Sequence, residues 1–158
     1  MPTVALQIAS TIAHLDSQLA LLTEHWAGFS DEELQQYPGP GRWSRKEILG
    51  HLVDSAANNH ARFVQAQIVA PQPLKMQPYE QDAWVRLAAY QHLPAADLLT
   101  LWTSYNRLIL HLLARIPESA LTTECFTFNH NPVTLHWLID DYVLHLEHHV
   151  RQIMHDEY

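Results

Sequence analysis

Apolar side chains recur at steps of three and four residues in four long stretches of this chain, and this periodicity constrains the fold most strongly. A helix turns once in about 3.6 residues, so this spacing gathers apolar side chains on one face and predicts amphipathic helices. The first stretch runs from Val4 to about Gly28, with apolar positions at Leu6, Ile8, Ile12, Leu15, Leu19, Leu22 and Trp26. The other predicted helices run from Ser44 to about Val69, from Pro94 to a point before Pro117, and from Thr134 to about Met154.

Capping residues mark several of the predicted helix starts. Ser44 is followed three positions later by Glu47, and Ser30 stands in the same relation to Glu33. A serine and a glutamate at this spacing can satisfy the free amide groups of a first helical turn from both sides. The first pair predicts the start of the second long helix, and the second pair predicts a short helical turn. Thr134 is the expected N-cap of the last helix.

The connections between the helices are long and uneven. The segment PLKMQPYEQDAWVRLAAYQHLP, with a short helix expected from Glu80 to Tyr90, separates the second and third helices and has the length of a crossover. The segment ESALTTECFTFNHNPVT, before the last helix, predicts irregular chain with brief extended structure. Because these loops look too irregular for a sheet, we expect an all-α four-helix bundle with a long crossover connection, in one domain covering residues 1–158.

Composition excludes several classes of function. The 158 residues carry 17 acidic against nine basic side chains, a formal charge of −8 that would repel nucleic acid and anionic lipid. No stretch approaches the roughly 20 apolar residues of a membrane span, and the first residues lack the pattern of a secretion signal. A single cysteine allows no internal disulfide. We therefore expect a cytoplasmic protein that binds neither nucleic acid nor membrane.

The 12 histidines are the unusual feature of the composition, and three of them lie in HLEHHVRQI, residues 145–153. His145 and His149 are one helical turn apart, so both imidazoles can point the same way and bind one metal ion. His148 lies about 100° around the helix and is expected at the rim of such a site or in its outer shell. On spacing alone, two such histidines are more often polar neighbours than ligands.

A third histidine on another helix changes that assessment. His51 lies at the edge of the apolar face of the second helix, where it points partly into the bundle. Alone it would be read as a core histidine, but with His145 and His149 it completes a set of three ligands. Three imidazoles leave a divalent ion at least one open position. Asp54, Glu147 or Gln152 could orient the imidazole N–H groups from the second shell, and Asp54 is the preferred candidate.

These motifs resemble those of a known family. GRWSRKEILGHLVDSAANNHARF is similar to the start of the second helix in the DinB/YfiT superfamily, and HLEHHVRQI resembles its C-terminal motif. PYEQDAWVRLAAYQHLP looks like the YfiT branch, so the resemblance spans most of the chain. It implies a four-helix bundle that binds nickel or zinc through His51, His145 and His149. It also implies a range of activities, since the superfamily includes bacillithiol S-transferases, mycothiol-dependent enzymes and proteins labelled as metal-dependent hydrolases.

Three functions are compatible with these observations. In the first, the protein is a metal-dependent enzyme in which Zn²⁺ or Ni²⁺ binds a low-molecular-weight thiol and directs it to an electrophilic substrate. In the second, the metal activates water and the enzyme is a hydrolase, which requires a general base such as Asp54 or Glu147. In the third, the chain is a non-catalytic metal- or small-ligand-binding module that works as a homodimer.

Other reactive or aromatic side chains have weaker claims. Cys125 has no cationic partner nearby in sequence and is expected to be a buried, inert thiol. Arg62, three turns after His51, could meet an anionic substrate group, but an exposed ion pair is the expected role. Four tryptophans could line a cleft, although core packing is expected for each of Trp43, Trp84, Trp102 and Trp137.

Overall fold

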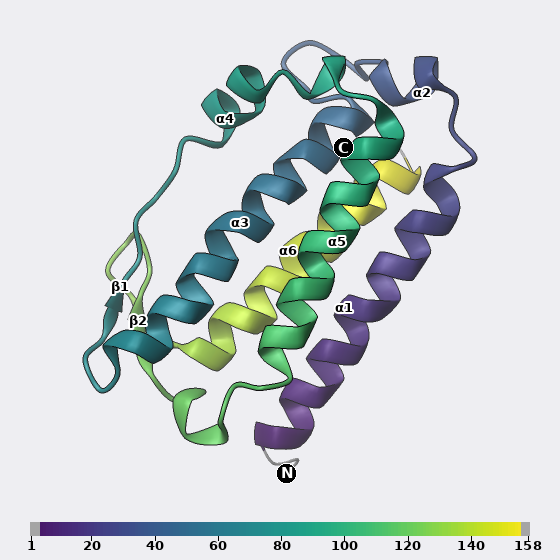
Figure 1. Ribbon diagram of the computed structural model, residues 1–158. Coiled ribbons are helices and arrows are strands. Elements are labelled where there is room, and N and C mark those ends of the chain that lie inside the picture. The colour runs from purple at the N-terminus through teal and green to yellow at the C-terminus, as the bar shows by residue number, and fades with distance from the viewer. Residues whose placement is uncertain (1–3, 156–158) are drawn as a thin grey trace.

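Four long helices form the body of the molecule (Figure 1). The computed structural model describes residues 4–155, so residues 1–3 and 156–158 of the predicted domain lie outside the described chain. The helices of the bundle are α1 (Val4–Trp26), α3 (Arg45–Val69), α5 (Ala95–Leu113) and α6 (Leu135–His155). The predicted all-α four-helix bundle is therefore confirmed, with each long helix within two residues of its expected bounds except at the C-terminal end of the third.

Local capping accounts for several of the helix starts. The Ser44 side chain accepts from the amide of Glu47, and the Glu47 carboxylate accepts from the amide of Ser44, at the start of α3. Ser30 and Glu33 make the same reciprocal pair at the start of the short helix α2 (Asp31–Gln35). The hydroxyl of Thr134 accepts from an amide in the first turn of α6 at 3.1 Å. All three predicted caps are thus present.

The long segment after α3 returns along the side of the bundle, so α3 and α5 run in the same direction (Figure 1). This return is the predicted crossover, and it includes helix α4 (Gln81–Ala88) and a 3₁₀ turn at Tyr90–His92. Helix α3 packs against both α5 and α6, and α1 packs against the same two helices. Helices α1 and α3 therefore occupy opposite corners, and the α3–α6 interface lies beside the crossover.

A small sheet, which the sequence did not lead us to expect, joins two of the connections. Strand β1 (Leu74–Lys75) pairs in parallel with β2 (Glu124–Phe126), which pairs antiparallel with β3 (Pro132–Thr134). The expectation of loops too irregular for a sheet was wrong. Strands of two or three residues are too short to carry an alternating pattern, and the β1–β2 pairing joins residues about 50 positions apart. The sheet ties the crossover to the loop before α6.

The core fills the space between the four helices, and its largest fully buried side chains are Trp102, Tyr142 and Phe63. The Tyr142 hydroxyl donates to the side-chain oxygen of Asn106, so the polar atoms of this pair are satisfied inside the core. The core packing predicted from the sequence is confirmed for Trp102. It is wrong for Trp84 and Trp137, whose side chains are 41% and 45% exposed. Among the helices that the structure describes, none is both long and apolar enough to cross a bilayer.

Gly50 allows the crossover to lie close to α3, and this gives a test of the fold. A Cβ at position 50 would lie 2.0 Å from a ring carbon of Tyr90, which is buried and hydrogen-bonded to Asp54. In an open helix, replacing glycine with alanine stabilises by about 1 kcal/mol. Here we expect Gly50→Ala to lower the free energy of unfolding by about 1–3 kcal/mol, because the buried ring must move.

Urea denaturation followed by circular dichroism would measure this change. Gly39→Ala is the matched control, because the nearest atom to its added Cβ lies 3.9 Å away. A Gly50→Ala variant as stable as the control would contradict the close packing of Tyr90 on α3.

Candidate metal centre

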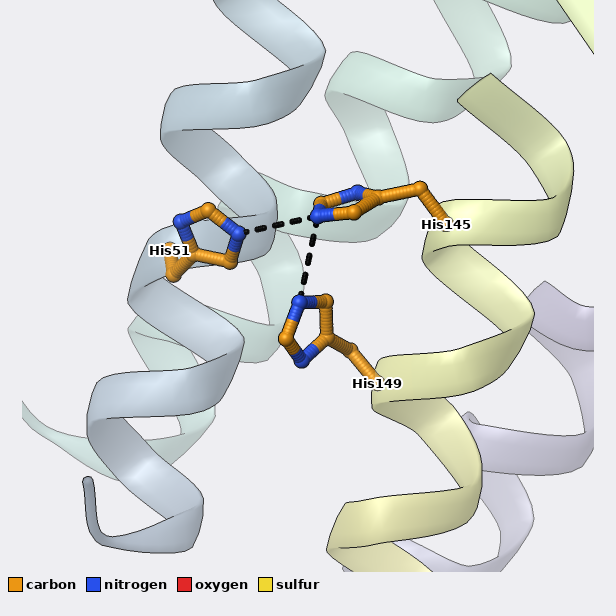
Figure 2. Close-up of side chains that lie close together, drawn as sticks. All are labelled: His51, His145 and His149. Atoms are coloured by element: carbon orange, nitrogen blue, oxygen red, sulfur yellow. Dashed lines mark hydrogen bonds between the residues drawn. The ribbon is translucent and has the colours of Figure 1, made fainter. Parts of the chain in front are cut away.

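Three histidine side chains from two helices meet inside the bundle (Figure 2). His51 extends from α3, and His145 and His149 extend from adjacent turns of α6. The Nε2 atom of His145 lies 3.2 Å from Nε2 of His51 and 3.1 Å from Nε2 of His149. The three ligand atoms all lie within 4.8 Å of one another. The structure thus brings together all three histidines that the sequence singles out.

The spacing of these nitrogens fits a single metal ion. Two nitrogens bound to one tetrahedral zinc at about 2.0–2.1 Å are separated by about 3.3 Å, close to the two observed distances. Three imidazoles satisfy the preference of zinc and of nickel for nitrogen ligands. The residues present therefore suit a divalent ion, with His51, His145 and His149 as the ligands that would hold it.

Burial keeps these imidazoles in the neutral form that a metal requires. Desolvation, together with the neighbouring His149 and His145, lowers the pKa of His51 to about 3. Desolvation also lowers the pKa of His145, to about 4, with a contribution from His149. The pKa of His149 is lowered as well, mainly by burial. No proton therefore has to leave these rings at neutral pH before a metal ion binds.

Hydrogen bonds from outside the triad orient two of the rings. The Nδ1 atom of His149 lies 2.7 Å from the side-chain oxygen of Gln152, so this nitrogen carries the proton and Nε2 presents its lone pair. The Nδ1 atom of His145 lies 3.5 Å from the hydroxyl of Ser55, to which Asn59 donates. The sequence analysis missed Ser55, although its position one turn after His51 on the same face of α3 was a usable signal.

The other second-shell candidates lie elsewhere. Asp54 accepts a hydrogen bond from the Tyr90 hydroxyl at 2.5 Å, and among the described residues no hydrogen bond joins it to an imidazole. Burial raises the pKa of this carboxyl group. Glu147 pairs with His14 and Arg151 instead of with the triad. His148 is exposed, with its ring 5.1 Å from that of His149, at the rim of the site.

An open cleft of about 260 Å³ reaches the triad at His149. Its walls include Arg42 and Trp43 from the loop before α3, Asp82 from α4, and Gln152 from α6. The Trp43 ring also packs on the ring of His51 at 4.9 Å between centroids, so it covers this ligand on one side. Trp43 thus stands at the cleft and not wholly in the core. A small molecule entering here would meet His149 first.

Neither Cys125 nor Arg62 lies at the three histidines. Cys125 is fully buried in the small sheet, where desolvation raises the pKa of its thiol to about 11, which agrees with an inert cysteine. Arg62 is half-buried and donates to the Asn59 side chain and to the Gln77 carbonyl group. The exposed ion pair expected for Arg62 is absent among the described residues, because burial against the crossover turns its guanidinium toward neutral acceptors.

The lowered pKa values predict how the metal-free protein responds to acid. In the unfolded chain a histidine titrates near 6.5, whereas His51 and His145 in the folded state resist protonation down to about 3 and about 4. Between these values the unfolded state binds more protons, so the free energy of unfolding falls as the pH falls below about 6.5. Each such histidine contributes at most about 1.4 kcal/mol per pH unit.

Urea denaturation in the presence of EDTA, from pH 7 to pH 5, would measure this slope. His51→Asn should flatten it, whereas His111→Asn, at an exposed position on α5, is the matched control. Equal slopes in wild type and His51→Asn would show that His51 is not held neutral by burial.

Comparison with known proteins places this arrangement in context. YfiT from Bacillus subtilis, a probable metal-dependent hydrolase with an unusual four-helix bundle topology, superposes with a TM-score of 0.82 at 23% identity, over 93% of this chain and 83% of YfiT. A mycothiol-dependent maleylpyruvate isomerase superposes with a TM-score of 0.68 at 16% identity, over 93% of this chain and 62% of the isomerase. No curated protein sequence matches the chain. The model of the DinB superfamily matches residues 14–153, and the chain therefore belongs to that superfamily.

Proposed function

We propose that the protein is a metal-dependent enzyme that transfers a low-molecular-weight thiol to an electrophilic small molecule. The observation that carries this proposal is the convergence of three imidazole Nε2 atoms beside an open cleft. His51, His145 and His149 would hold the ion, for which we propose Zn²⁺ or Ni²⁺. The dependence of a structural relative, the maleylpyruvate isomerase, on mycothiol supports a thiol as one reactant.

The bound ion would supply positive charge at an open position, which favours the deprotonated form of a thiol or of water that binds there. The protein residues have separate tasks. Gln152 holds the ring of His149 with its Nε2 atom toward the ion, and Ser55 supports the ring of His145. Trp43 covers His51 and keeps water from one side of the site. The cleft leaves the other side open to the two reactants.

The thiol must come from a small molecule because the chain has no reactive thiol of its own. Cys125 is the only cysteine, it is fully buried, and burial raises the pKa of its thiol to about 11. A thiolate on this side chain is therefore rare at neutral pH and has no path to a substrate. An external thiol at the triad avoids both problems.

Hydrolysis is the second candidate, and one observation favours it. Asp82 lines the same cleft as His149, where its carboxylate could take a proton from an attacking water molecule. Asp54 and Glu147, the bases considered from sequence, are engaged by Tyr90 and by His14 and Arg151. The likeness of the fold to that of YfiT, a probable metal-dependent hydrolase, is compatible with this second activity.

Replacing the ligands one at a time tests the metal centre. We expect His51→Ala, His145→Ala and His149→Ala each to lose the bound metal, because two imidazoles hold a divalent ion far more weakly than three. Elemental analysis of protein purified without an affinity tag would measure the metal content. His148→Ala is the matched control, since His148 is exposed and outside the triad, and it should keep about one ion per chain.

Activity assays on wild type and the same four variants separate the candidate functions. Conjugation of monobromobimane with glutathione, cysteine and N-acetylcysteine measures thiol transfer, and cleavage of p-nitrophenyl acetate measures hydrolysis. Transfer by wild type and His148→Ala, with loss in the other three, is the expected result. Hydrolysis without transfer would favour the second candidate, and bound metal with neither activity would favour a binding module.

Gln152 gives a finer test of the site. Gln152→Leu removes the acceptor at 2.7 Å from His149, and we expect metal affinity to fall by about 10- to 100-fold while the fold is kept. Gln152→Glu keeps an oxygen acceptor and should retain most of the affinity. Competition with a fluorescent zinc chelator would measure both. Equal affinities for Gln152→Leu and wild type would remove Gln152 from the site.

A further inference from the structure

A second cavity, of about 380 Å³, lies beside the small sheet, away from the metal centre. We propose that this cavity binds a small organic anion with an aromatic or aliphatic body, such as an aryl carboxylate. The inference is independent of the proposed enzyme activity, because none of the residues that line the cavity belongs to the triad or to the cleft beside it.

The walls of the cavity would hold the apolar body of such a molecule. One wall is the chain that follows β1, with Met76 and Pro78, and the other is the end of β2 and the turn after it, with Phe126 and Phe128. The amide of Met76 donates to the carbonyl group of Phe126 at 3.1 Å, which fixes the two walls side by side. A preformed concave site lined by aromatic and aliphatic side chains is typical of small-ligand pockets.

The ionisable groups that line the cavity are basic, although the chain as a whole has a formal charge of −8. Lys75 and His130 are the only ionisable side chains among the lining residues, and neither is acidic. His130 lies in a left-handed conformation, with φ of 59°, at the turn between β2 and β3. A local excess of positive charge on an acidic protein selects for an anion at this place.

Arg62 adds a second positive charge, besides that of Lys75, next to two residues that line the cavity. Its guanidinium stacks over the Phe128 ring, 5.1 Å from the centroid, and donates to the Gln77 carbonyl group, and both of these residues line the cavity. Among the described residues no carboxylate lies within ion-pair distance of Arg62, and the charge of Asp141 acts on it only from farther away. A half-buried arginine without a close counter-charge is a site where a ligand carboxylate is stabilised.

The cavity and the metal centre lie at different places along α3. Arg62 follows His51 by three helical turns, a rise of about 16 Å, and the sheet lies beside the C-terminal end of α3 (Figure 1). A ligand small enough for the cavity would therefore not reach the three histidines. Ligand binding at the two sites can therefore be distinguished, because each ligand would shift the NMR signals of a different set of amides.

NMR titration of the ¹⁵N-labelled protein would test the proposal. The probe is 1-naphthoate, and the neutral 1-naphthalenemethanol has nearly the same shape without the charge. We expect saturable amide shifts confined to residues 75–77 and 126–130, with a Kd for naphthoate at least tenfold below that for the alcohol. Shifts that do not saturate, equal Kd values for the two probes, or shifts centred on His51 and residues 145–149 would each overturn the proposal.

Variants identify the groups that select the anion. Arg62→Met and Lys75→Met should each weaken naphthoate binding by about three- to tenfold and leave binding of the alcohol unchanged. Arg107→Met is the matched control, because it removes one positive charge from an exposed position on α5 and should change neither Kd. If Arg62→Met does not fold, Lys75→Met decides, because Lys75 is exposed. Unchanged naphthoate binding in Lys75→Met and in any folded Arg62→Met would refute the assigned role of these charges.

Discussion

The contact between α3 and α6 is the interaction on which the rest of the structure depends. It places a histidine with no exposed surface opposite two others, and burial keeps all three rings neutral. The Nδ1 atom of His51 has no hydrogen-bond partner among the described residues. A buried polar atom in that state costs free energy, which the apolar core around it must offset. The three imidazoles thus lower the stability of the bundle relative to an apolar core of the same shape.

The course of the chain explains where this centre can open. Because the crossover makes α3 and α5 parallel, the chain returns along the outside of the bundle before α5 begins (Figure 1). The return carries α4 and Asp82 to the triad, and the loop before α3 brings Trp43 and Arg42 to the same cleft. A bundle with short turns between antiparallel neighbours would have no such walls. The topology therefore supplies the cleft, while the helices supply the ligands.

The parts of this structure that could be predicted from sequence are those governed by neighbours along the chain. The caps at Ser30, Ser44 and Thr134 each depend on a residue three positions away, and the stripe that pairs His145 with His149 depends on one helical turn. The choice of Asp54 over Gln152 as the partner of an imidazole depended on side-chain direction across the bundle. Tyr90, brought in by the crossover, engages Asp54, and no local pattern contains that contact. Gln152 reaches His149 from one turn along the same helix, a local spacing that the sequence does show.

The chemistry at the centre is set by its walls more than by its ligands. An ion held by three neutral imidazoles would make any molecule at its open position more acidic, whether that molecule is a thiol or water. Transfer requires that a thiolate and an electrophile fit together in the cleft, whereas hydrolysis requires a base within reach of water. Asp82 and Arg42 line the same cleft as His149, so one of its walls carries a carboxylate and another a guanidinium. The choice between the two reactions therefore depends on the position of Asp82, which the crossover carries, and not on the histidines that both reactions share.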